Sequence, residues 1–200
     1  MNKDKNITLT CGLLFFAIVM TAVIIYDGIS YRNWSYGGYI FKGIIPLAVT
    51  IMYVIFASRA AEKKEGLIIG AAGIFLSHIF ILYGFDTLGK DRGTYISYMA
   101  TYYIITNIVA ILLYITAFVG IYRYIKKNDC RKEICEIPMF LVIGYKVFDS
   151  LNIISNYIYS VERNFKVDAQ SIFASVFVNM LFVFQLFAVY FSLKIKEERN

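Results

Sequence analysis

The sequence predicts an all-α, polytopic membrane protein in which six transmembrane helices form one bundle with both termini in the cytoplasm. Of its 200 residues, 59% are hydrophobic and 17% are charged, and the mean hydropathy is +0.62. Soluble domains carry about 25% charged residues. Six apolar segments follow one another, each near the roughly 20 residues that a bilayer-crossing helix needs. No linker rich in Gly, Pro or Ser divides the chain, so we expect a single domain over residues 1–200.

The six predicted spans cover about residues 7–26, 37–57, 66–85, 95–122, 137–160 and 170–193. The first is uncharged and lacks a small-residue cleavage site, which predicts an uncleaved span and not a signal peptide. In the second, Pro46 frees the carbonyl of Lys42 and predicts a kink. The third carries small residues at helical spacing, which predict a helix-packing face: Gly66, Gly70, Gly73 and Ser77.

The fourth apolar segment has 28 residues, which predicts a tilted or projecting helix. A basic loop that we expect to contain Cys130 and Cys135 leads to the fifth span, where Pro138 near the start is tolerated. The odd number of cysteines indicates no disulfide framework, and cytoplasmic thiols stay reduced. We predict no metal site, because this pair lacks further ligands at close spacing.

The distribution of Lys and Arg predicts the orientation. The N-terminus, the second and fourth loops and the C-terminal tail carry 13 of these residues, and the other loops carry 5. The positive-inside rule therefore predicts a protein of the cell membrane with both termini in the cytoplasm. Because topology and an anionic lipid surface account for the net charge of +6, we expect membrane lipid as a partner and no nucleic acid.

The fifth span combines apolar length with polar groups at its centre. On a helix, Tyr145, Asp149, Asn152 and Asn156 share one narrow stripe, and Lys146 lies beside it. A Lys or an Asp at the centre of a membrane helix costs about 2.5 to 3.5 kcal/mol on insertion scales. We therefore expect this stripe to face protein or water.

Other spans bring polar groups to a similar predicted depth. His78 and Asp149 each lie 12 residues from the cytoplasmic start of their spans, about 18 Å at 1.5 Å per residue. The resulting hypothesis is a ligand-binding layer in the outer-middle part of the bundle, formed by Asp149, Lys146, His78, Asn107, Asn152 and Asn179. The alternative is a set of interhelical hydrogen bonds with one ion pair from Lys146 to Asp149.

Three classes of function fit such a layer. The first is binding or movement of a small polar solute or ion without a cofactor. The second is a membrane enzyme with Asp149 as general base and His78 or Lys146 as its partner. The third is a scaffold or accessory protein with a partner subunit. The sequence contains none of the common soluble catalytic motifs.

Three stretches resemble the YhhN family of lysoplasmalogenase-like membrane hydrolases. They are YRNWSYGGYIFKGIIPL at 31–47, FLSHIF at 75–80 and VFDSLNIISN at 147–156. The resemblance implies cleavage of a lysolipid vinyl-ether bond, with Lys42, His78 and Asp149 as catalytic candidates. The family has eight spans, and its Lys and Pro adjoin where Lys42 and Pro46 stand apart here. The six-span substrate-binding subunits of vitamin-type transporters are similar in outline only.

Overall fold

The computed structural model describes residues 3–31, 39–58, 64–82, 97–126, 133–164 and 169–197, and in this part of the chain it is helical almost throughout. The elements are α1 Lys3–Tyr31, the π-helix η1 Tyr39–Ile44, α3 Ile45–Ser58, α4 Lys64–Leu82, α5 Ser97–Lys126, α6 Glu133–Glu162 and α7 Ala169–Glu197. Because η1 continues directly into α3, the described residues form six rods, one for each predicted span. The predicted all-α fold is confirmed.

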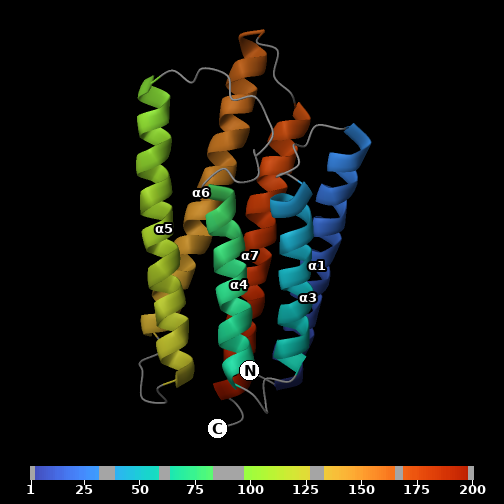
Figure 1. Cartoon of the computed structure of the whole chain (residues 1–200), viewed down its shortest axis with the longest axis vertical. Coiled ribbons are helices and arrows are strands. Elements are labelled where there is room, and N and C mark those ends of the chain that lie inside the picture. Colours follow the sequence, from blue (N-terminus) through green and yellow to red (C-terminus); the bar gives the residue numbers. More distant parts are fainter. Residues whose placement is uncertain are drawn as a thin grey trace.

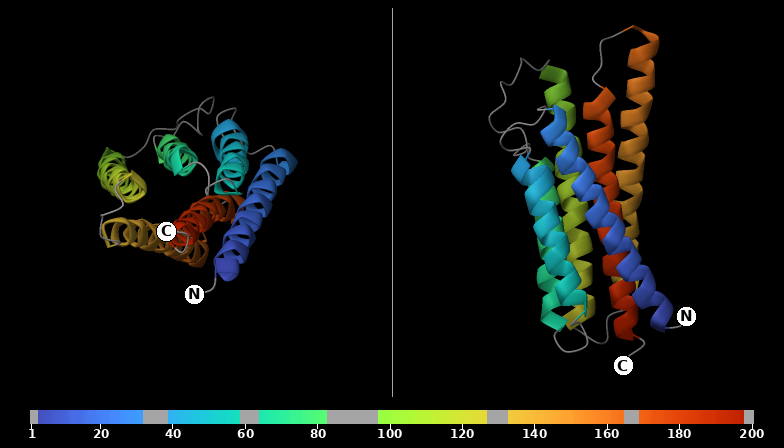
Figure 2. Two further views of the ribbon diagram at one scale, coloured as in Figure 1. Left: turned by 90° about the horizontal axis from the view of Figure 1, so that it is seen from below. Right: turned by 90° about the vertical axis from the view of Figure 1, so that its right-hand side faces the viewer.

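The six rods form two layers of three (Figures 1 and 2). Seen end-on, α5, α4 and α3 make one layer, and α6, α7 and α1 make the other. Contacts join neighbours within each layer, and further contacts join α5 to α6, α4 to α7 and α1 to α3 across them. The first residues of α1 and the last residues of α7 lie at the same end of the bundle. Helix α7 occupies the centre of its layer and is buried along most of its length.

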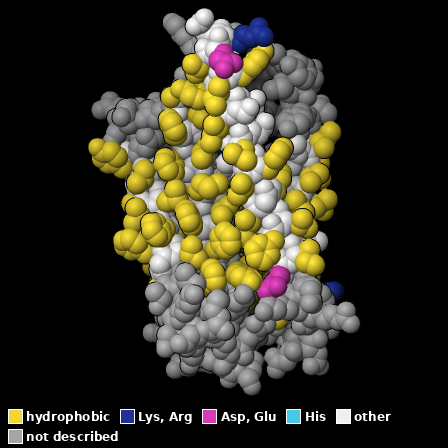
Figure 3. Space-filling model, turned by 180° about the vertical axis from the view of Figure 1, so that it is seen from behind, with side chains coloured by type: hydrophobic (Ala, Val, Ile, Leu, Met, Phe, Trp, Pro, Cys, Tyr) yellow, Lys and Arg dark blue, Asp and Glu magenta, His cyan; other side chains and the backbone are white. Residues whose placement is uncertain are grey.

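The outer surface is apolar over the middle of the bundle. Helical stretches long and apolar enough to cross a membrane are Ile105–Lys126, Cys135–Glu162 and Ser175–Leu193, and the described residues of the other rods contribute shorter apolar stretches. Figure 3 shows a broad band of hydrophobic side chains, with charged groups toward its two ends. Contiguous apolar surface on this scale is not typical of a water-soluble monomer. It suits contact with lipid.

Both prolines lie in helical segments. The sequence predicted a kink at Pro46 and a place near the start of a helix for Pro138, and the structure differs in detail at both. Pro46 cannot donate to the carbonyl four residues before it, and the chain ahead of it widens into the π-helix η1. Helix α6 begins at Glu133, so Pro138 lies inside it rather than at its start. Cys135 consequently belongs to α6 and is buried, whereas we expected it in a loop; Cys130 lies outside the described residues.

The small-residue face of α4 packs against α3, as the spacing of its glycines predicts. A Cβ atom on Gly70 would lie 2.6 Å from Cδ2 of Tyr53, and one on Gly73 would lie 3.2 Å from Cε of Met52. Tyr53 is fully buried by this close approach. The glycines therefore set the distance between the two helices.

Candidate polar binding site

Aromatic rings fill the centre of the bundle, where α4 and α7 face each other. The Phe182 ring of α7 stacks on the His78 imidazole of α4, with centroids 3.9 Å apart and an interplanar angle of 18°. The rings of Tyr114 and Phe75 meet Phe182 edge-on, at 5.1 and 5.7 Å between centroids. These four side chains are all buried. The polar groups on either side of Phe182 are therefore separated by a dense aromatic core.

The first polar cluster joins α6 and α7. The Lys146 ammonium donates to Oδ1 of Asn179 at 2.9 Å, and Nδ2 of Asn179 donates to Oδ2 of Asp149 at 2.8 Å. Lys146 and Asn179 are each only 5% exposed, whereas Asp149 is half-buried. The amide thus turns its oxygen to the cation and its nitrogen to the anion. We call these three residues the charged cluster.

The direct Lys146 to Asp149 ion pair of the alternative hypothesis is not formed. The two residues are three positions apart on α6, close enough to pair. Within the described helices, however, neither has a salt-bridge partner, and the Asn179 amide links them instead. The sequence could not reveal this arrangement, because it depends on how α7 is placed against α6.

The Lys146 ammonium is surrounded by aromatic rings. Its Nζ atom lies 5.8 Å from the ring centroids of Tyr114 and Tyr145 and 6.0 Å from that of Phe182. These distances are at the outer limit of cation–π attraction. An ammonium has three donors, and Lys146 makes one hydrogen bond to the residues that the structure describes.

The second polar cluster joins α4, α7 and α3. Nε2 of His78 donates to Oε1 of Gln185 at 3.1 Å, and Nε2 of Gln185 donates to the Thr50 hydroxyl at 2.8 Å. The Thr50 hydroxyl in turn donates to the Pro46 carbonyl at 2.7 Å. Each donor in this series meets an acceptor, and the side chains of His78, Gln185 and Thr50 are all buried. We call these three residues the amide relay.

The two clusters lie at different levels, which corrects the expectation of one shared layer. Asn179 and Gln185 are six residues apart on α7, about 9 Å of helical rise. His78 pairs at the Gln185 level and Asp149 at the Asn179 level. Equal numbers of residues from the start of two spans do not give equal depths, because one helix is shifted along the bundle axis relative to the other. The Phe182 ring lies between the two clusters: it stacks on His78, and its centroid is 6.0 Å from Nζ of Lys146.

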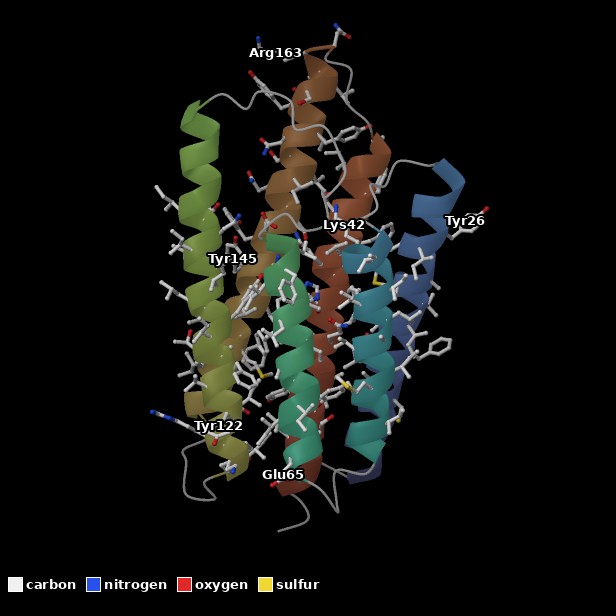
Figure 4. The ribbon with its side chains drawn as sticks, viewed as in Figure 1. Tyr26, Lys42, Glu65, Tyr122, Tyr145 and Arg163 are labelled. Carbon is white, nitrogen blue, oxygen red and sulfur yellow. The ribbon has the colours of Figure 1, made fainter. Side chains whose placement is uncertain are left out.

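The remaining predicted site residues lie outside both clusters. Asn152 is exposed, and its Oδ1 accepts a weak 3.5 Å hydrogen bond from exposed Asn156. The predicted stripe on α6 is thus half-buried at Tyr145 and Asp149 and exposed beyond them. Asn107 is half-buried on α5. Lys42 is half-buried in η1, which packs against α1, α3 and α4 (Figure 4).

Three buried residues in or beside the two clusters were not predicted from the sequence, although a sequence feature accompanies each of them: Gln185, Thr50 and Tyr114. Gln185 is an amide in the middle of the apolar sixth span, six residues after Asn179. Thr50 stands one turn after Pro46, where a Thr hydroxyl can bond the carbonyl four residues earlier. Tyr114 is seven residues after Asn107, on the same side of the fourth segment. None of these traces indicates a partner on another helix.

The charged cluster combines a buried ammonium with a half-buried carboxylate. Over the described ranges, no three His, Cys, Asp or Glu side chains gather to hold an ion. The cluster instead offers hydrogen-bond donors on a buried cation and acceptors on a half-buried carboxylate. No protein-family model, curated protein or solved structure matches this sequence. The resemblance to the YhhN family therefore stays a prediction.

Proposed function

We propose that this chain is a six-span protein of the cell membrane that binds or moves a small polar solute or ion at the charged cluster. The observation that carries the proposal is the state of Lys146. Its ammonium is buried at the centre of α6 and makes a single hydrogen bond to a described residue, the bridging Asn179. Its charge is balanced by Asp149, which is only half-buried.

The energetics favour a functional site over a purely structural tie. Two charges at this depth cost about 2.5 to 3.5 kcal/mol each on insertion scales. Interhelical hydrogen bonds in membrane proteins return about 0.6 kcal/mol on average. The two bonds through Asn179 therefore offset a small part of the cost, and polar residues that are this expensive within spans commonly mark solute or ion pathways.

The amide relay supports a structural role for His78. Because Nε2 of His78 donates to Gln185 and the series ends on a backbone carbonyl, the relay holds α4, α7 and α3 together without an open donor at its end. His78 has no hydrogen bond or ion pair to Asp149 in the described structure. The lysolipid hydrolase that the resemblance implies thus receives no support from a contact between His78 and Asp149, two of its three catalytic candidates.

The proposed orientation places the charged cluster on the outer side of the amide relay, because Asn179 precedes Gln185 on α7, which runs toward the cytoplasmic end. Helix α6 runs away from the end at which α1 begins and α7 ends (Figure 1). With the termini in the cytoplasm, as the loop charges predict, Asn152 and Asn156 lie on the outer side of Asp149. A solute would then reach the cluster from outside the cell.

The experiment compares ligand effects on purified wild-type protein and on variants of the cluster. The probes are Na⁺, K⁺, acetate, phosphate and the standard amino acids, and the readout is thermal unfolding in detergent. A probe at 100 times its dissociation constant stabilises the folded state by about 2.7 kcal/mol. We expect at least one probe to stabilise the wild type and to lose this effect in Lys146→Met. The exposed Lys126→Met, at the end of α5, is the matched control. Identical responses of Lys146→Met and the wild type to every probe would refute the proposal.

A further inference from the structure

The charged cluster carries both signs of charge at one site. Lys146 and Asp149 balance each other, and Asn179 orients its amide dipole between them. A simple anion would be attracted by Lys146 and repelled by Asp149, and a simple cation would experience the reverse. A ligand with two opposite charges of its own meets attraction at both ends. The electrostatics therefore favour a dipolar ion over a single-charge ion.

A buried hydroxyl adds a second donor beside the cation. Tyr114 is fully buried, and its hydroxyl oxygen has no hydrogen-bond partner among the described residues. The Tyr114 ring centroid lies 5.8 Å from Nζ of Lys146. A buried hydroxyl without a partner costs about 1 to 3 kcal/mol. The part of the chain that the structure describes thus holds a buried donor near Lys146 whose hydrogen bond is left for an added group to make.

The unmet hydrogen-bonding groups match the two ends of a zwitterion. A carboxylate can accept from both the Lys146 ammonium and the Tyr114 hydroxyl. A primary ammonium can donate to Asp149, of which one oxygen is engaged by Asn179. Side chains three residues apart on a helix have Cβ atoms about 5 to 6 Å apart. A small molecule with two charged groups can therefore contact Lys146 and Asp149 at once, whereas a single ion is too small to do so.

Exposure along α6 indicates where such a ligand enters. From buried Lys146, the side chains pass through half-buried Asp149 to exposed Asn152 and Asn156. Figure 4 shows Tyr145 where α6 lies beside α5. Toward the end opposite the termini these two helices diverge (Figure 1), and Asn107 stands on α5 two turns beyond Tyr114. This face of α6 offers a polar approach to the cluster.

We infer that the charged cluster binds a small zwitterion, with the carboxylate held by Lys146 and Tyr114 and a primary ammonium held by Asp149. This inference rests on the proposed function, because it names the ligand class of the same site. In the complex, the charges of Lys146 and Asp149 are balanced by the two charges of the ligand, whereas in the free protein they balance each other. Tyr114 is a ligand-binding residue in this arrangement, and its hydroxyl gains a partner only in the complex.

The test is direct calorimetric binding to the purified full chain in lipid nanodiscs. The probes are the standard amino acids, β-alanine and γ-aminobutyrate, with acetate and methylammonium as single-charge controls. For any zwitterion that binds, the N-acetyl form removes the ammonium and the methyl ester removes the carboxylate. The protein variants are Lys146→Met, Asp149→Asn and Tyr114→Phe, with Lys126→Met as the control.

We expect at least one zwitterion to bind, and removal of either ligand charge to weaken binding about 10- to 100-fold. Lys146→Met and Asp149→Asn should have effects of the same size, and Lys126→Met none. Tyr114→Phe should weaken binding about 2- to 10-fold without lowering the unfolding midpoint of the ligand-free protein, because its hydroxyl has no partner there. A merely structural hydroxyl would lower that midpoint and leave affinity unchanged.

The remaining outcomes separate the two proposals. If acetate or methylammonium binds as tightly as any zwitterion, and does so through Lys146 or Asp149, the zwitterion inference is wrong and the proposed solute site stands. The zwitterion inference is equally wrong, and the solute site equally stands, if only Na⁺, K⁺ or phosphate, the inorganic probes of the thermal-unfolding experiment, acts through these residues. If no probe of either kind binds, both proposals are wrong.

Discussion

Two amides on α7 show how much the partner of a residue determines what the residue does. Asn179 lies between opposite charges, whereas Gln185 lies between an imidazole and a hydroxyl. Both are buried in apolar surroundings, and both join helices. Asn179 is bonded to an ammonium and a carboxylate, which have further donors and acceptors to offer a charged ligand. Residue type and depth are therefore insufficient to distinguish a binding residue from a structural one.

The amide relay predicts a measurable coupling between α7 and α3. Gln185→Leu leaves the His78 and Thr50 groups without their amide partner, and we expect a loss of about 1 to 3 kcal/mol in the free energy of unfolding. A double-mutant cycle with Thr50→Val, followed by SDS-induced unfolding in micelles, should give a coupling near 0.6 and at most about 1.7 kcal/mol. Strictly additive effects of the two substitutions would contradict the relay.

The bridging amide of Asn179 predicts an effect on ligand binding, whereas the Gln185 amide predicts one on stability. Asn179→Leu retains the approximate size of the side chain but removes both hydrogen bonds of the charged cluster. With Lys146 and Asp149 no longer held apart, we expect ligand binding to be lost, as in the charge variants. Calorimetric titration with the probe that binds the wild type checks this. Retention of wild-type affinity would show that the bridge is not part of the site.

At the scale of the element, close approach and offset between helices decide which groups meet. The glycines of α4 bring it against Tyr53 and Met52 of α3, which places His78 and Thr50 on helices that meet the same α7 side chain. Helix α6 behaves differently along its length, because its second half is exposed on most sides. It ends at Glu162, where Asn164 takes a left-handed φ of 58°.

The α3–α4 contact predicts the effect of one methyl group. Gly70→Ala would place Cβ 2.6 Å from the Tyr53 ring, so the helices must separate, and we expect a loss of about 1 to 3 kcal/mol in unfolding free energy. Gly12→Ala on α1 is the matched control, because nothing lies within 4 Å of its added methyl. Its higher helix propensity should be neutral or stabilise by up to about 1 kcal/mol. Equal effects of the two substitutions in SDS-induced unfolding would contradict the close approach.

At the scale of the whole molecule, six antiparallel rods place the start of α1 and the end of α7 at one end of the bundle. This arrangement agrees with an even number of spans, and the excess of Lys and Arg in alternate loops predicts which end is cytoplasmic. The charged residues on the face in Figure 3 lie toward its two ends, and the apolar band lies between them. Polar groups at mid-height are instead gathered inside, around α7.

Cysteine labelling tests the orientation. In a variant whose native cysteines are replaced, we place a single cysteine by Asn164→Cys or by Lys126→Cys, at exposed positions on opposite ends of the bundle. A membrane-impermeant maleimide should label the first in intact cells and the second only after permeabilisation. The reverse pattern would place the termini outside the cell. Labelling of both in intact cells would contradict a six-span protein.

The sequence by itself determined the number, the order and the approximate limits of the helices. In a lipid environment every backbone group must be satisfied within its own segment, so each apolar run specifies a helix without reference to the others. It also identified Lys146, Asp149 and Asn179 as costly polar groups, and the small-residue face that packs on α3. These properties depend on composition and local spacing alone.

Only the tertiary structure decided which polar groups meet. Asn179 separates Lys146 from Asp149, and His78 pairs with Gln185 about two turns of α7 away, whereas the depth estimate had placed His78 and Asp149 together. The offset, tilt and rotation of each helix arise from side-chain packing between helices, such as Gly70 on Tyr53 and His78 on Phe182. Those contacts join residues far apart in the chain, so no local pattern records them.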